Sequence, residues 1–113
     1  MATAKFVQEG SAIDYTPSSD VSAGDVVVQG ELVGVSRLDI AADTLGALAV
    51  TGVFDFPKAT GVGEGIAAGA NVYWDEAEGQ AGTDSETGAN KLIGKTVAAA
   101  GDDDATVRVR MSQ

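Results

Sequence analysis

Carboxylates are the side chains with the greatest chemical potential in this 113-residue sequence. The run Asp102–Asp104 could suggest a divalent-cation site, because hard cations take carboxylate oxygens as ligands. A calcium loop, however, needs alternating ligands and a bidentate Glu at fixed spacing, and the run has neither. Three consecutive Asp side chains point in different directions, so the pattern favours a solvated turn. The acidic cluster at 75–78 is interpreted in the same way.

Two aspartates stand beside aromatic residues, in a pattern that superficially resembles a sugar subsite. Asp55 lies between Phe54 and Phe56, and Asp75 follows Trp74. Paired carboxylates perform glycoside hydrolysis, so a hydrolase that uses Asp55 and Asp75 is a distant hypothesis. A chain this short offers little depth for a catalytic cleft. The sequence also contains no His and no Cys, which removes the commonest general base and all thiolate chemistry.

The glycine-rich stretch 61–65 is the remaining candidate for ligand binding. A phosphate-binding loop needs a strand before it, a helix after it and, in the P-loop, a Lys followed by Ser or Thr. Here Glu64 stands in the middle and no helix is predicted to follow. We therefore expect no cofactor, no metal and no enzymatic activity.

The charge balance restricts the class of partner. The chain has 17 acidic and 7 basic residues, for a formal net charge of −10. Nucleic acids and anionic membranes attract clustered Lys and Arg, so neither is an expected partner. Arg108 and Arg110 form an alternating pair, and the other cations are scattered along the sequence. No run approaches the roughly 20 apolar residues of a membrane span.

Short β-rich runs separated by Gly-rich turns make up most of the chain. Thr106–Met111 alternates apolar and basic residues, which is typical of a strand with one buried face. The segment Asp39–Val50 is predicted to be a loop or a single turn. The pattern predicts an all-β fold, either a small β-sandwich or a partly open β-barrel. The other predicted strands are Val26–Val28 and Leu32–Val35, which form a tight hairpin, then Val50–Phe56, Val72–Trp74 and Leu92–Val97.

The same order of a turn and three strands occurs in both halves of the sequence. In the first half, Ala23–Val28 and Leu32–Val35 are followed by a closing strand through Val53 and Phe56. The second half has Ala68–Trp74, Leu92–Lys95 and Thr106–Met111 in the same order. A duplicated β unit would explain this order. Chance similarity in a Gly- and Val-rich β protein is the alternative.

The domain organisation follows from these patterns. Residues 1–15 are predicted to be either an N-terminal arm or the first strand, and residues 16–113 a single β domain. Within it, residues 75–90 are acidic and Gly-rich and contain no apolar residue larger than Ala. Such a segment cannot bury enough surface to order itself, so it is predicted to be a mobile surface loop.

The candidate site residues are apolar and aromatic. Tyr73 and Trp74 are adjacent in a strand, so one side chain should face the core and the other should face outward. An outward aromatic side chain is a natural anchor for a protein interface. The arm supplies the remaining candidates, whose contacts must offset the entropy lost when the arm is ordered. The predicted interface residues are Phe6, Val7, Ile13, Tyr15, Tyr73 and Trp74.

Several segments, taken in order, resemble a known family. They include Lys5–Gly10, Ser22–Val28, Gly52–Lys58, Ala67–Asp75 and Ala105–Arg110. Together these segments resemble the capsid cement, or decoration, proteins of tailed phages, a family long catalogued as a domain of unknown function. The resemblance implies a protein that binds the outer surface of the major capsid protein lattice and stabilises the mature head. It implies neighbouring copies as further partners, in trimers or dimers, with synthesis in the host cytoplasm and a final location on the virion.

A second function remains open at this stage. The chain could instead be a small ligand-binding or carbohydrate-binding β module that uses Trp74 and Tyr73. Retention on a glycan array that is lost in Trp74→Ala would favour this second function.

Overall fold

The computed structural model describes residues 3–113, and these form two antiparallel β-sheets. The first sheet has the order β1-β4-β3-β2 and the second β5-β9-β8-β6-β7. The first sheet contains β1 (Ala12–Tyr15), β2 (Val26–Gln29), β3 (Leu32–Ser36) and β4 (Gly46–Ala49). The second contains β5 (Gly52–Pro57), β6 (Asn71–Asp75), β7 (Gln80–Gly82), β8 (Lys91–Thr96) and β9 (Thr106–Met111). The predicted all-β class is confirmed.

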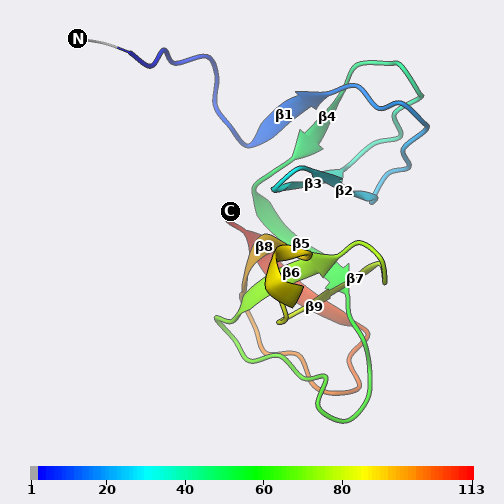
Figure 1. Cartoon of the computed structure of the whole chain (residues 1–113), viewed down its shortest axis with the longest axis vertical. Coiled ribbons are helices and arrows are strands. Elements are labelled where there is room, and N and C mark those ends of the chain that lie inside the picture. Colours follow the sequence, from blue (N-terminus) through cyan, green and yellow to red (C-terminus); the bar gives the residue numbers. More distant parts are fainter. Residues whose placement is uncertain (1–2) are drawn as a thin grey trace.

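The two sheets form two lobes stacked along the long axis of the molecule (Figure 1). The second sheet curls, and an isolated parallel bridge between Lys58 and Ala81 brings the ends of its outer strands β5 and β7 together. Within residues 3–113 neither sheet closes into a barrel. The arrangement is compatible with the predicted β-sandwich.

The two sheets repeat one strand plan. Strands β1, β4, β3 and β2 occupy the same order in the first sheet as β5, β9, β8 and β6 in the second. The registers also agree, since Val27 pairs with Gly34 in the first sheet and Val72 pairs with Gly94 in the second. The second sheet differs by the additional strand β7 on the far side of β6.

The turns that enter β2 and β6 repeat as well. The amide of Ser36 donates to the carbonyl of Asp25 at 2.9 Å, and the amide of Thr96 donates to the carbonyl of Ala70 at 3.0 Å. Each turn is preceded by an isolated antiparallel bridge, between Val21 and Ile40 in one unit and between Ile66 and Ala100 in the other. Both the turn and the ladder therefore support a duplicated unit.

The boundary of the predicted unit was wrong. The strand through Val53 and Phe56 is β5, which pairs with β9 and opens the second unit. The first unit closes instead with β4, which lies inside the segment Asp39–Val50 that was predicted to be a loop or a turn. Its sequence Gly-Ala-Leu-Ala has little β-propensity. It forms a strand because β1 and β3 flank it on both sides, so tertiary pairing overrides propensity.

One apolar core spans both sheets. Val33 and Val35 of β3 belong to the same buried cluster as the inner face of the second sheet. The rings of Phe56 and Trp74 lie 6.1 Å apart at the centre of this cluster. The predicted alternation of β9 is confirmed, because its apolar side chains are buried and its basic side chains are exposed.

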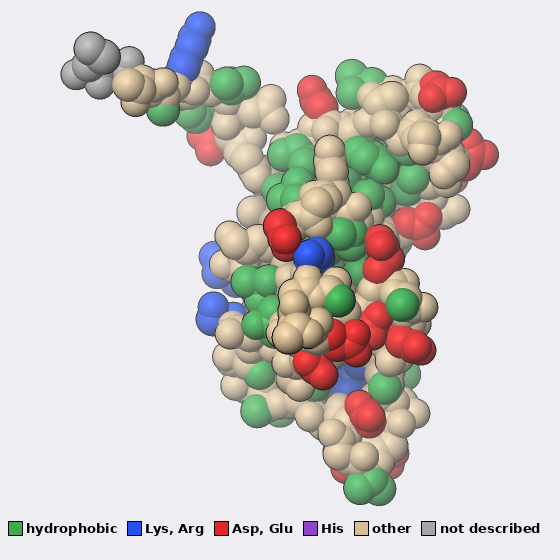
Figure 2. Space-filling model, in the orientation of Figure 1, with side chains coloured by type: hydrophobic (Ala, Val, Ile, Leu, Met, Phe, Trp, Pro, Cys, Tyr) green, Lys and Arg blue, Asp and Glu red, His purple; other side chains and the backbone are tan. Residues whose placement is uncertain are grey.

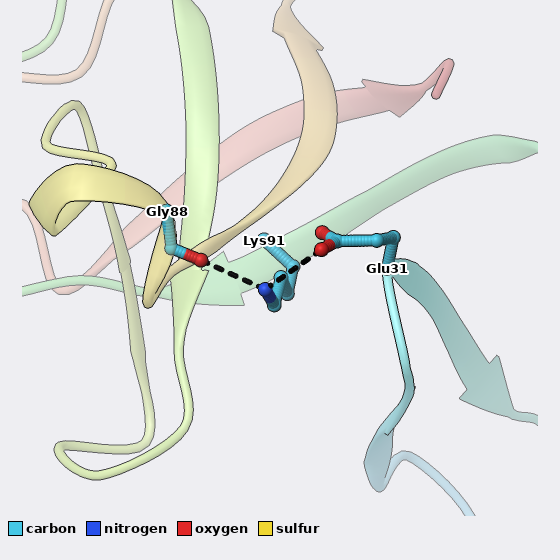
Figure 3. Close-up of polar contacts among 3 residues, drawn as sticks. All are labelled: Glu31, Gly88 and Lys91. Atoms are coloured by element: carbon cyan, nitrogen blue, oxygen red, sulfur yellow. Dashed lines mark hydrogen bonds and ion pairs between the residues drawn. The ribbon is translucent and has the colours of Figure 1, made fainter.

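Polar contacts tie the two lobes together beside this core. The ammonium of Lys91 donates to a Glu31 carboxylate oxygen at 3.1 Å and to the Gly88 carbonyl at 2.7 Å (Figure 3). The side-chain amide of Gln113 completes the link: its nitrogen donates to the Val33 carbonyl at 2.7 Å, and its oxygen accepts from the Val33 amide at 2.8 Å. The side chain of Gln113 thus acts as one rung of a β-ladder on β3.

The acidic segment 75–90 is more ordered than predicted. It contains β7 and a short 3-10 helix, η1 (Glu86–Gly88). The prediction counted only large apolar side chains, but the small side chain of Ala81 is 4% exposed and packs into the core. The methyl group of one alanine, together with pairing to β6, is enough to fix the middle of the segment.

Candidate protein interfaces

The carboxylates considered for catalysis are not brought together. Asp55 lies on β5 and Asp75 at the end of β6, and these two strands do not pair with each other. Asp55 instead accepts two hydrogen bonds from the guanidinium of Arg108, at 2.9 and 3.2 Å. These bonds hold the pKa of the Asp55 carboxyl below its ordinary value. Among residues 3–113, no group of three His, Cys, Asp or Glu side chains is placed to hold a metal ion.

The N-terminal segment contains the most exposed apolar side chains of the predicted site. Residues 3–10 form no strand, and they leave the first lobe as an extended arm (Figure 1). Phe6 is 77% exposed and Val7 is 83% exposed. An apolar pair this exposed gains free energy only when another surface covers it. The arm is therefore a candidate contact with a partner.

Ile13 and Tyr15 lie at the root of this arm, on β1. They are two residues apart on one strand, so they share a face of the first sheet, and both are half-buried. Ile13 pairs with Leu48 and Tyr15 with Gly46 on the neighbouring strand β4. One side of β1 has no partner strand within the described residues.

The two aromatic residues of β6 have different environments. Trp74 is 7% exposed and packs against Phe56, so its ring is not available to stack on a sugar. Tyr73 is half-buried. Of the two side chains, Trp74 faces the core and Tyr73 is the more accessible.

An apolar groove lies between the lobes, where the chain passes from the first sheet to the second. It has a volume of about 780 Å³. Three of its lining side chains are large, apolar and exposed: Leu38 at 76%, Leu45 at 66% and Val53 at 53%. Ser11, at the root of the arm, forms part of the same wall. Sequence reasoning missed this groove, because its walls come from separate turns and strands.

A second surface continues from Val53 across the outer side of β5, β9 and β8. Arg110 pairs with Val53 on one side and with Lys95 on the other, and Arg108 stands two residues away on the same face. The amide of Val97 donates to the Arg108 carbonyl, which places Val97 beside this strand. We call this surface the cationic face; its residues are Val53, Lys95, Val97, Arg108 and Arg110.

The cationic face changes one part of the prediction that the other cations are scattered: Lys95 joins the Arg108 and Arg110 pair, whereas the other four cations lie elsewhere. Lys95 lies directly opposite Arg110, although the sequence separates them by a long loop. Only the pairing register of β8 with β9 reveals this. Figure 2 shows Lys and Arg side chains at the left edge of the lower lobe, while Asp and Glu side chains gather over its middle.

Comparison with known proteins yields one match. A family model described as phage cement protein matches residues 7–111, which include both sheets. No curated protein and no solved structure matches the chain significantly. No helix within residues 3–113 has the length and apolar character needed to cross a membrane.

Proposed function

The chain belongs to the phage cement protein family, and on this premise we propose that it binds the outer surface of the major capsid protein lattice and stabilises the mature head. The family match carries the proposal, because it extends over nearly the whole chain and indicates a structural role in the phage capsid. Copies of the chain meet as trimers or dimers at local symmetry axes of the shell.

Lattice-specific binding is sufficient for this role. A protein that binds the assembled shell and not the free subunits lowers the free energy of the shell by mass action, as any ligand specific to one state does. Many small contacts repeated by symmetry then add up over a particle. Neither a catalytic group nor a cofactor is required.

The arm is the proposed contact with the lattice. Burying Phe6 and Val7 contributes about 3–6 kcal/mol, at roughly 1.5–3 kcal/mol for each large apolar side chain. Fixing the backbone of four arm residues costs about 4–8 kcal/mol. At the middle of each range apolar burial falls short of the cost, so we expect the arm to form main-chain hydrogen bonds as well. Addition of the arm as a strand to a capsid subunit would supply them.

Co-sedimentation tests the proposal. Purified protein is mixed with assembled, mature-form shells or with free capsid subunits, and the fraction that pellets is measured. We expect the wild type to pellet with shells only. The double variant Phe6→Ser/Val7→Ser should lose at least tenfold in affinity. Val62→Ser is the control, because Val62 is also an exposed apolar residue but lies on a loop of the second lobe.

Two results would contradict the proposal in different ways. If the wild-type protein stayed in the supernatant with shells, lattice binding itself would be wrong. If the arm variant bound as tightly as Val62→Ser, the lattice contact would lie elsewhere on the protein.

A further inference from the structure

The cations of this protein are unevenly distributed. Lys58 is buried, and its ammonium donates to three backbone carbonyls. Lys91 is paired with Glu31. On the cationic face, Arg108 has a single carboxylate partner, and within the described chain neither Lys95 nor Arg110 forms an ion pair. This face therefore carries uncompensated positive charge on a protein with a net charge of −10.

The opposite charge is concentrated on the segment 75–90, here called the acidic insert. It contains five Asp or Glu residues and no Lys or Arg. Glu76, Glu78, Asp84 and Glu86 are exposed. Two of the carboxylates accept local hydrogen bonds, Asp75 from the Glu78 amide and Asp84 from the Glu86 amide. The insert therefore has a defined shape and not only a charge.

The two charged surfaces belong to only one of the duplicated units. By register, the pair Lys95 and Arg110 on β8 and β9 corresponds to the pair Val35 and Ala49 on β3 and β4. Val35 and Ala49 are buried, whereas Lys95 and Arg110 are exposed. The acidic insert corresponds to the turn between β2 and β3, which consists only of Gly30 and Glu31. The second unit alone therefore presents both charged surfaces.

The two surfaces cannot neutralise one another within a single copy. Lys95 lies opposite Asn71, at the start of β6, whereas the insert begins at Asp75, at its end. At about 3.3 Å per residue, the length of β6 separates them by roughly 13 Å. This backbone separation exceeds the Debye length of about 8–10 Å at moderate salt, so solvent ions screen much of the attraction between the two surfaces of one copy. Within residues 3–113, no ion pair joins the two surfaces.

We propose that the cationic face of one copy binds the acidic insert of the next. The contact joins two different surfaces, so it can form twice in a reciprocal two-fold dimer or repeat around a ring such as a trimer. A contact between two cationic faces is disfavoured by repulsion. Val53 and Val97 supply the apolar part of the interface at opposite corners of the face, and the side chains of Arg108 and Arg110 on the central strand β9 lie between them. The inference deepens the proposed function by defining how neighbouring copies meet.

Cross-linking distinguishes this contact from one between two cationic faces. The chain contains no Cys, so single cysteines can be introduced without background. Val97→Cys marks the cationic face and Ala77→Cys marks the acidic insert. The two variants are mixed and treated with a short bis-maleimide, in concentrated solution and on shells. Val62→Cys, on an exposed loop, reports random collision.

We expect the mixed Val97→Cys and Ala77→Cys product to exceed both same-variant products and the Val62→Cys control by at least tenfold. A predominant Val97→Cys homodimer would overturn the proposal, because it would indicate that two cationic faces meet. A mixed product no greater than the Val62→Cys control, in solution and on shells alike, would also overturn it. The solution experiment needs no shell, so failure of lattice binding leaves its result interpretable.

Charge reversal provides a second, independent readout. In the Val97→Cys background, Lys95→Glu/Arg110→Glu should lower the mixed product at least tenfold. Placing Glu76→Lys/Glu78→Lys on the Ala77→Cys partner should restore it. All four positions are exposed, so the variants should fold. If the reversed pair failed to restore cross-linking while both proteins kept the wild-type unfolding midpoint, the electrostatic pairing would be refuted.

Discussion

Among the glycines of the described chain, Gly94 has the backbone atoms that would lie closest to an added Cβ. A Cβ at this position would overlap the carbonyl oxygen of Arg110 and would lie 2.7 Å from the amide nitrogen of Ser112. Both atoms belong to backbone, so no side-chain rotation can relieve the overlap. Gly94→Ala must therefore push the end of the β9 chain away from β8. The amide of Ser112, which donates to the Ile93 carbonyl at 2.9 Å, would lose its partner.

The expected cost follows from these contacts. Overpacking in a well-packed interior costs about 1–3 kcal/mol. Loss of about two ladder hydrogen bonds adds roughly 0.5–1.5 kcal/mol each. The free energy of unfolding should fall by about 2–6 kcal/mol, which is a large part of the roughly 5–15 kcal/mol that stabilises a typical domain. With a urea m-value of about 1–3 kcal/mol/M, the midpoint should fall by about 2 M.

Urea unfolding followed by tryptophan fluorescence measures this change, because Trp74 is the one tryptophan and is buried. Gly82→Ala is the matched control. Gly82 is also a strand residue of the second sheet, a Cβ added to it would meet no atom within 4 Å, and it needs no left-handed backbone. Its variant should change stability by less than about 1 kcal/mol. A Gly94→Ala midpoint within about 0.5 M of the control would refute the argument from backbone overlap.

Three further predictions concern polar contacts. Lys58→Met should lower the free energy of unfolding by about 2–4 kcal/mol in the same urea assay, because three backbone carbonyls lose their charged donor. An unchanged midpoint would contradict this and would mean that water takes the place of the ammonium group. Gln113→Ala should cost about 1–2 kcal/mol through its two lost bonds to Val33, and a neutral result would show that the lobes need no such link. Arg108 lowers the pKa of Asp55, so the ion pair stabilises the folded protein above about pH 4, and this stabilisation is lost as the pH falls through the lowered pKa. Asp55→Asn should therefore reduce the loss of stability between about pH 4 and 2. The effect should be small, because both side chains are about half exposed, and an unchanged pH profile would contradict this prediction.

The strands with strong alternation or β-branched runs were predictable from sequence. Thr106–Met111 has the predicted bounds, and the hairpin of β2 and β3 has the predicted tight turn. The local residue pattern of these strands indicates β-structure by itself, since a buried Val alternates with an exposed Arg or follows another Val. Local pattern and tertiary environment agree there.

The missed strands lack such a local signal. Gly46–Ala49 and Gln80–Gly82 consist mainly of Gly and Ala, and they become strands because neighbouring strands pair with them. The same misreading shifted the boundary of the duplicated unit. With Gly46–Ala49 treated as a loop, the next apolar strand, Gly52–Pro57, was assigned to the wrong half.

Some residues of the candidate interfaces could also be predicted from the sequence, and others could not. Phe6 and Val7 were identifiable because a large apolar pair stands in a segment with no strand pattern. Trp74 was recognised as one of a pair with opposite facings, but only the packing against Phe56 shows which way it points. The neighbouring positions of Lys95 and Arg110 depend on the register between two strands. Register is a long-range property, so no local reading of the sequence could have found the cationic face.

The thermal stability of phage heads is the most direct measure of whether this protein stabilises the capsid. Particles assembled without the protein are heated, with and without added purified protein, and the temperature at which the packaged DNA is released is recorded. We expect the wild-type protein to raise this temperature to a saturating value at stoichiometric occupancy, whereas Phe6→Ser/Val7→Ser should do so only at much higher concentration. A release temperature that wild-type protein leaves unchanged, at a concentration that saturates the particles, would contradict stabilisation of the head by this protein.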